Sequence, residues 1–208
     1  MKDVIDIGKV KDTNGNQVTL DLLIGNDLFK SLELQKSWVV SFIDIIEKAK
    51  ELYPSMPTDE FLHNNNLQDS HWSWLDKAKV LNSPEYLWFT LESETKIEAA
   101  MIVCHPQKRY KEDIDIFYVD YFAVAPWNRP TQISQPLLKG LGTIMLKGVG
   151  RYISGSLSYQ EGFSLHSLPQ ALGFYKRIGM EDFGQDAQKS DLHYLEMMKG
   201  RAEVFYHE

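Results

Sequence analysis

The sequence is short of three features, and each shortage excludes a class of protein. Among its 208 residues there is one cysteine, Cys104, so the chain can form neither an internal disulfide nor a cysteine-based metal cage. No apolar run approaches the roughly 20 residues that span a bilayer, and MKDVIDIGKV at the N-terminus lacks the apolar stretch of a secretory signal. His63 and His71 have no carboxylates at ligand spacing. We therefore expect a soluble, cytoplasmic protein with no metal and no membrane contact.

The chain also has fewer basic than acidic residues. The chain has 22 Lys and Arg against 29 Asp and Glu, for a formal net charge of −7. Nucleic-acid binding needs a positive surface facing the phosphates, so we expect no nucleic-acid partner. The one small basic cluster, Lys108-Arg109 with Lys111, is interpreted as a solvated loop. An acidic chain agrees better with an amine as its ligand.

What is present is an ordinary globular composition, with 43% hydrophobic and 25% charged residues. The length suits a single domain over residues 1–208. Its first part shows alternating apolar segments at 4–10 and 17–24 around Asn14-Gly15, which predicts a β-hairpin. A helix is expected over 28–52, capped by Asn26 or Asp27.

The remaining elements follow from the same periodicities. After Pro54 and Pro57, the stretch 54–70 is expected to be a loop, followed by a short helix at 70–81. Further strands are predicted at 86–93, 96–106, 114–126, 162–168 and 192–198, with helices at about 137–158 and 169–178. Strands and helices in this order predict an α/β (α+β) fold, a mixed sheet with helices on both faces.

Three segments of the C-terminal half contain recognisable sequence motifs in addition to a periodic pattern. They are FAVAPWNR, KGLGTIML and SLHSLPQALGFYKRIGM. In this order and spacing they resemble the GNAT superfamily of acyl-CoA-dependent N-acetyltransferases, over roughly residues 85–198 and most strongly over 114–180. The resemblance implies a mostly antiparallel sheet, an acyl-CoA-binding core at 85–198, and an acceptor side formed by residues 1–84.

The resemblance also implies acetyl-CoA as acyl donor and places its binding residues. Its pyrophosphate would meet Lys139-Gly140-Leu141-Gly142-Thr143, because a glycine turn at a helix N-terminus offers free N–H groups to an anion. Its pantetheine would lie along Phe122, Ala123 and Val124 as an added strand.

The chain departs from the family pattern at two places. Leu137 stands where the family usually has Arg or Gln, so Lys139 or Arg129 would have to supply the charge for the phosphates. Ser167-Leu168-Pro169 stands where an asparagine is common. Both departures favour the alternative hypothesis of a non-catalytic acyl-CoA-binding or regulatory module.

Tyr175 favours catalysis, because the family tyrosine at this place can protonate the departing thiolate. The other interpretation is a tyrosine that packs the rim of the core. An alkyl ammonium has a pKa of about 10.4, so a base must deprotonate the acceptor. Asp120 is the first candidate for that base, on a strand where a bulge often breaks the alternation, and Glu161 and His166 are the alternatives.

Aromatic and amide side chains are gathered in the segments that would form the acceptor pocket. They are Trp38, His71, Trp72, Trp74, Trp127, Gln132 and Gln135. Tryptophans could hold a cationic small-molecule or peptide amine by cation–π attraction. The alternative interpretation is that these tryptophans belong to a core or to the face of a homodimer. A third hypothesis, acetylation of aminoacyl-tRNA, would require a larger basic patch than the sequence provides.

Overall fold

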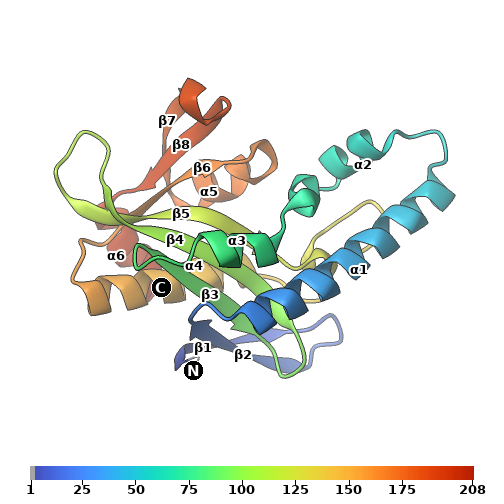
Figure 1. The fold of residues 1–208 in the computed structure, drawn as a ribbon, viewed down its shortest axis with the longest axis horizontal. Coiled ribbons are helices and arrows are strands. Elements are labelled where there is room, and N and C mark those ends of the chain that lie inside the picture. Colours follow the sequence, from blue (N-terminus) through green and yellow to red (C-terminus); the bar gives the residue numbers. More distant parts are fainter. Residues whose placement is uncertain (1–2) are drawn as a thin grey trace.

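The computed structural model describes residues 3–208, in which eight strands form one twisted sheet (Figure 1). The spatial order is β1-β2-β3-β4-β5-β6-β8-β7, and each neighbouring pair is antiparallel except β5 and β6. The strands are β1 Asp3–Lys11, β2 Gln17–Ile24, β3 Tyr86–Glu92, β4 Ile97–Lys108, β5 Asp115–Val124, β6 Phe163–Ser167, β7 Glu181–Asp186 and β8 Leu192–Met197. This arrangement confirms the predicted mixed, mostly antiparallel sheet.

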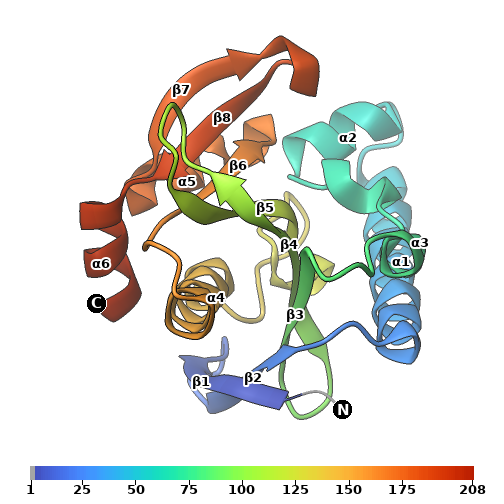
Figure 2. The ribbon, with the colours of Figure 1, turned by 60° about the vertical axis from the view of Figure 1, so that its left-hand side comes forward.

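Helices cover both faces of the sheet (Figure 2). On one side lie α1 Leu28–Leu52, α2 Thr58–Asn64 and α3 Trp74–Val80; on the other lie α4 Leu141–Leu157, α5 Leu172–Ile178 and α6 Lys199–His207. Short 3-10 turns are η1 Gln68–His71, η2 Pro126–Asn128, η3 Pro169–Ala171 and η4 Ala187–Lys189. No helix among residues 3–208 is long and apolar enough to cross a membrane.

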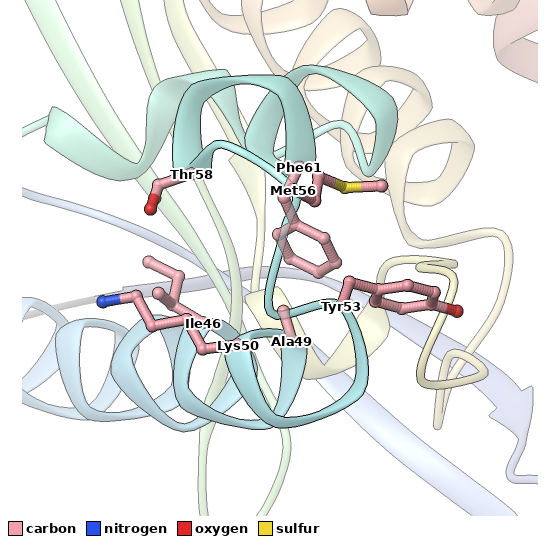
Figure 3. A pocket seen from close by; sticks show the side chains of 7 residues that line it. All are labelled: Ile46, Ala49, Lys50, Tyr53, Met56, Thr58 and Phe61. Atoms are coloured by element: carbon pink, nitrogen blue, oxygen red, sulfur yellow. The ribbon is translucent and has the colours of Figure 1, made fainter.

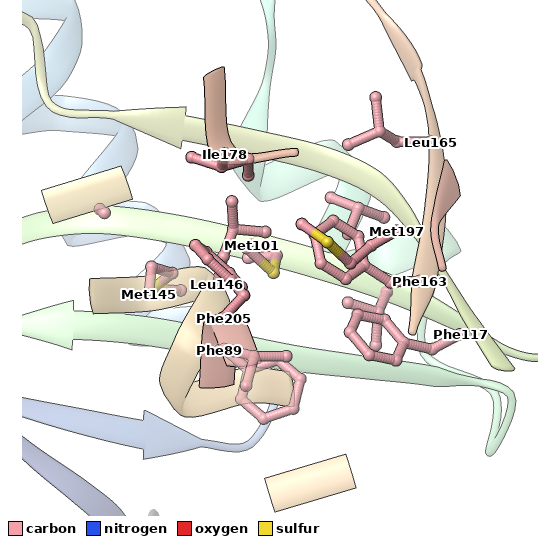
Figure 4. Packing of buried hydrophobic residues seen from close by; sticks show 14 of the residues in the cluster. Phe89, Met101, Phe117, Met145, Leu146, Phe163, Leu165, Ile178, Met197 and Phe205 are labelled. Carbon is pink, nitrogen blue, oxygen red and sulfur yellow. The ribbon is translucent and has the colours of Figure 1, made fainter. Parts of the chain in front are cut away.

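Strand β4 shows why the sheet has a core on each side. Met101 and Val103 belong to the core under α4–α6, while Ala100 and Ile102 belong to the core under α1–α3. Successive side chains of a strand point to opposite faces, so a strand covered on both faces is apolar throughout. Figure 4 shows the first core, where strand residues such as Met101 and Phe117 meet Leu146 of α4 and Phe205 of α6.

The N-terminal hairpin and the first helix are confirmed with their local chemistry. The Asp12 carboxylate accepts hydrogen bonds from the N–H groups of Asn14 and Asn16, both at 2.8 Å, and Gly15 takes a φ of 86° in the turn. Of the two candidate caps, Asp27 is the residue that accepts from the first amides of α1, those of Phe29 and Lys30.

The predicted loop at 54–70 is wrong, because α2 lies within it and η1 begins in it. Phe61 of α2 is buried against α1, and the space left between the two helices is only about 10 Å³, too small for a ligand (Figure 3). Strand β7 and helix α6 were not predicted. Strand β7 is a polar edge strand, and α6 buries only Ala202, Phe205 and Tyr206, so neither has a strong apolar period.

The basic cluster 108–111 is not simply a solvated loop. Arg109 is 4% exposed, and its Nε lies 3.4 Å from Oε1 of the fully buried Glu196. Its Nη2 also donates to the Glu161 carbonyl at 3.1 Å. A buried charge requires a partner, and here the partner comes from β8, distant in the sequence. Arg109 is therefore structural and is not a free cation.

Candidate active site

The parallel strands β5 and β6 separate after a short pairing. Three residue pairs join them, from Phe117–Phe163 to Val119–Leu165. Beyond Val119, β5 continues through Phe122, Ala123 and Val124 with β4 on one side and no strand opposite. A strand edge of this kind can accept an extended ligand through main-chain hydrogen bonds.

The separation coincides with a β-bulge at Asp120. Ile102 pairs with Tyr121 and Val103 pairs with Val119, so Asp120 is the extra residue of β5. The expected break in alternation is therefore confirmed. The bulge directs Tyr121 and Ala123 to the core under α1–α3, whereas Val119 faces the opposite core.

The N-terminus of α4 has backbone amides that make no helical hydrogen bond. Gly140 precedes the helix at a φ of 79°, and no side chain caps the helix. The helical bonding begins with Ile144 N–H donating to the Gly140 carbonyl at 3.1 Å, which leaves the amides of Leu141, Gly142 and Thr143 without helical acceptors. The predicted helix start at 137 is wrong, because Leu138 N–H bonds instead to the Asn128 side chain at 3.0 Å.

A cavity of about 490 Å³ lies at this helix end. Arg129, Lys139, Gly140, Leu141, Gly142 and Val124 are among the residues that line it. The structure thus brings together most of the residues that the sequence assigned to coenzyme A. A Cβ on Gly142 would lie 3.3 Å from the Phe174 ring and 3.7 Å from the Phe122 ring, so a larger residue there would force the Phe174 ring to shift by a few tenths of an ångström.

Arg129 lines the same cavity, but its guanidinium is already engaged. Nη1 and Nη2 lie 2.5 and 2.7 Å from the two carboxylate oxygens of Asp69, and Nε donates to the Val124 carbonyl at 2.7 Å. The positive charge is therefore balanced within the protein. Lys139 is exposed at the cavity and is the cation better placed for a phosphate.

The loop that carries these residues is held by Glu98 of β4, which the sequence analysis missed. Its carboxylate accepts hydrogen bonds from Trp127 Nε1 at 2.7 Å, Asn128 Nδ2 at 2.6 Å and Ser93 Oγ at 2.8 Å. Glu98 is 4% exposed. A lone carboxylate within the apolar run IEAAMIVC was the available signal, because a buried charge requires several donors.

A second cavity, of about 280 Å³, is lined by Phe122, two residues before the Val124 that lines the first cavity. Asp120, His166 and Tyr175 all line it, so the three candidate catalytic residues meet although 55 positions separate Asp120 from Tyr175 (175 − 120). Glu161, the third candidate base, does not line it; its carboxylate lies 3.8 Å from His207 Nε2.

Tyr175 both packs the core and faces this cavity. It is 7% exposed, and its ring meets Phe174 edge-on with centroids 5.2 Å apart. Burial raises the pKa of the phenol far above its usual value, and no protein group among residues 3–208 hydrogen-bonds the hydroxyl. The side chain is therefore a protonated donor at every physiological pH.

Two opposing effects act on the pKa of the Asp120 carboxyl. Burial raises the pKa of its carboxyl, while Lys189 and Lys77 lower it to a smaller extent. Lys77 Nζ lies 3.6 Å from the centroid of the Tyr121 ring, and burial lowers the pKa of this amine. Two lysines are therefore near enough to Asp120 to favour its charged form, and one of them, Lys189, also lines the cavity.

His166 is hydrogen-bonded at both ring nitrogens. Nδ1 lies 2.9 Å from the Tyr118 hydroxyl, and Nε2 lies 3.2 Å from an Asp186 carboxylate oxygen. Burial lowers the pKa of the imidazole, and the Asp186 carboxylate only partly offsets this. Asp186 was missed, because it belongs to the edge strand that the sequence did not predict.

Most of the tryptophans considered for the acceptor pocket belong to a core and not to that pocket, as one of the two interpretations expected. Trp38 and Trp74 are buried in the core under α1, and Trp127 is bound to Glu98. Trp72 is the tryptophan that lines the second cavity, edge-on to Tyr121 at 5.1 Å. Of the other predicted pocket residues, Gln135 lines the first cavity. The Gln132 backbone N–H donates to the Asn65 side chain, and the His71 ring is hydrogen-bonded to the Gln68 carbonyl.

No family model and no curated protein matches the sequence. Solved structures do match the fold. An uncharacterised Bacillus halodurans protein is 10% identical with a TM-score of 0.59, covering 98% of this chain and 96% of its own. A Desulfovibrio desulfuricans protein assigned to the GNAT family of acetyltransferases is 12% identical, with a TM-score of 0.54 and coverage of 86% and 98%. FdhC, a nucleotide-linked sugar GNAT, is 10% identical, with a TM-score of 0.51 and coverage of 95% and 93%.

Proposed function

We propose, on the premise that this chain has the GNAT fold, that it transfers an acetyl group from acetyl-CoA to a primary amine of a small molecule or peptide. The observation that carries the proposal is the position of Phe122–Val124, an open strand edge with one cavity lined by Val124 and another lined by Phe122. One cavity holds an uncapped helix N-terminus, and the other holds a carboxylate, a histidine and a buried phenol.

The donor would occupy the first cavity and the open edge. The amides of Leu141, Gly142 and Thr143, with Lys139, would bind the pyrophosphate, because helix N-termini attract anions. Pantetheine would extend along Phe122, Ala123 and Val124. The thioester would then reach the second cavity beside Tyr175.

The chemistry is a direct displacement in a ternary complex. The neutral amine attacks the thioester carbonyl carbon, the C–N bond forms, and the C–S bond breaks. Tyr175 gives its hydroxyl proton to the departing thiolate, and a proton from the new amide nitrogen restores the phenol. Before attack the ammonium must lose a proton, for which Asp120 and His166 are the groups in the cavity.

The experiment that tests the proposal is calorimetric titration of the protein with acetyl-CoA and with free coenzyme A. Micromolar binding of both is expected. Thiol release would then be followed with a panel of primary amines comprising cadaverine, glucosamine and a peptide with a free N-terminus. Binding without turnover of any amine would favour the alternative, an acyl-CoA-binding module without catalysis. No binding up to millimolar acetyl-CoA would contradict the donor site itself.

A further inference from the structure

The second cavity contains a chain of hydrogen bonds that leads away from it. Tyr118 and His166 both line the cavity, and Asp186 lies behind His166 at the end of β7. We infer that Tyr118, His166 and Asp186 form the relay that removes the proton from the acceptor amine. This inference rests on the proposed acetyl transfer and names Tyr118 as the residue that meets the amine.

The bonding partners fix the proton positions in the relay. A carboxylate only accepts hydrogen bonds, so the His166 Nε2 that faces Asp186 must carry a proton. In the neutral ring Nδ1 is then the acceptor, and the Tyr118 hydroxyl donates to it. Both ring nitrogens are occupied, so the amine cannot deliver its proton to His166 directly.

Tyr118 can pass the proton from the amine to His166 in one concerted step. The ammonium nitrogen gives a proton to the Tyr118 oxygen while the Tyr118 hydroxyl proton passes to Nδ1 of His166. The nitrogen keeps the electron pair and becomes the nucleophile. Burial raises the pKa of the Tyr118 phenol, so the two transfers occur together and no phenolate persists. The products are a neutral amine and an imidazolium ion paired with Asp186.

The proton also has an exit. His166 lines a further cavity, of about 520 Å³, which Asp186, Gln185 and Tyr110 line as well. The imidazole thus separates the acceptor cavity from a second opening. Around the ring stand Tyr118 of β5, Tyr194 of β8 at 5.2 Å between centroids, Asp186 of β7 and Lys189 of η4.

Asp120 takes a different part in this scheme. It makes no hydrogen bond with His166; the imidazole has Tyr118 and Asp186 as its two partners. As the carboxylate of the same cavity, Asp120 attracts the ammonium form of the acceptor and holds it beside Tyr118. Tyr118 and His166 are thus catalytic residues, and Asp186 is a positioning residue that acts through His166.

The first test requires no acceptor. Histidine-selective NMR of the intact protein should show His166 protonated at Nε2, with Nδ1 as the acceptor. Asp186→Asn should move the His166 pKa downward, because it removes the carboxylate that stabilises the imidazolium. Lys189→Gln should move it upward, because it removes a neighbouring cation. A ring protonated at Nδ1, or a pKa unmoved in Asp186→Asn, overturns the relay.

The second test is the pH dependence of kcat/KM with the best amine of the panel. The acid limb should follow the His166 pKa and shift in opposite directions in Asp186→Asn and Lys189→Gln. Tyr118→Phe should lower kcat/KM by about 10²–10⁴-fold, the range typical of general base catalysis. Acetyl-CoA affinity should be unchanged.

Tyr194→Phe is the matched control, because it removes a neighbouring hydroxyl that bonds to Glu196 rather than to His166. It should keep the rate and the acid limb of the unmodified protein. Turnover that survives intact in Tyr118→Phe overturns the relay and leaves the proposed acetyl transfer standing. Absence of turnover in the unmodified protein would instead contradict the proposed function, and the NMR titration would still decide the hydrogen-bond chain.

Discussion

Arg129 and Asp69 form an ion pair in which two guanidinium nitrogens face two carboxylate oxygens, at 2.5 and 2.7 Å. Their side chains are 11% and 6% exposed. The pair joins η1, on the proposed acceptor side, to the loop after β5, on the proposed donor side. It thereby ties η1 to the loop that lines the first cavity.

Asp69→Ala should strongly destabilise the fold. The substitution leaves a buried guanidinium without its counter-ion, which typically costs about 3–5 kcal/mol. Urea unfolding measures the loss. Lys79→Ala is the control, since it breaks the exposed pair with Asp76 and should change stability little. Equal effects of the two substitutions would show that the Arg129 pair is not a structural link.

Tyr175→Phe should lower turnover at least tenfold and leave acetyl-CoA affinity nearly unchanged, because only the proton donor is removed. Because burial raises the pKa of the phenol, ionisation of Tyr175 should add no basic limb to the pH profile below about pH 10. Thiol release and calorimetry provide the two readouts. Tyr152→Phe, on α4 and against Phe89, is the control. Parallel losses of binding and rate would remove Tyr175 from the role of acid.

Gly142→Asp should weaken acetyl-CoA binding at least tenfold, or about 1.4 kcal/mol. A carboxylate at the α4 N-terminus repels the pyrophosphate, and its Cβ presses on Phe174. Gly142→Ala separates the two effects, because it adds the Cβ without the charge. Gly155→Asp, later in the same helix where a Cβ meets no atom within 4 Å, controls for net charge. Unaltered affinity in Gly142→Asp would place the phosphate site elsewhere.

Asp182 should make stability depend on pH at the acid end. Hydrogen bonds from Lys176, then from His193 and the Gly184 amide, hold the pKa of its carboxyl far below the usual value. Because the folded pKa is depressed, the stabilisation is complete above the unfolded value of about 3.9 and is lost as pH falls toward the folded value. Thermal unfolding of the unmodified protein and Asp182→Asn should therefore differ at pH 6 and converge below pH 4. A constant difference between the two curves would contradict this linkage.

Local signals in the sequence were sufficient for the framework of the fold. Asn14-Gly15 specifies the hairpin turn, Asp27 caps the first long helix, and the apolar runs from 86 to 124 specify the central strands. Each of these depends on backbone conformation or periodicity within a few neighbouring residues. The same is true of Gly140, whose positive φ ends the loop before α4.

The weakly periodic elements were not predicted, because they lack such local signals. Strand β7 alternates polar residues at a sheet edge, and it supplies Asp186, which bonds to His166. Helix α2 has seven residues and buries one of them. Such elements form because the rest of the chain provides a surface for them, which a local pattern does not reveal.

The sequence by itself determined the order of the strongly periodic elements, the glycine turn before α4, and the residues Asp120, His166 and Tyr175 as candidates. The tertiary structure alone decided which charges are free. Arg129 and Arg109 are both basic in the sequence, yet Asp69 and Glu196 neutralise them in the folded chain. Whether a buried charge is available depends on groups that approach it from distant segments, because desolvation makes an unpaired ion too costly to retain.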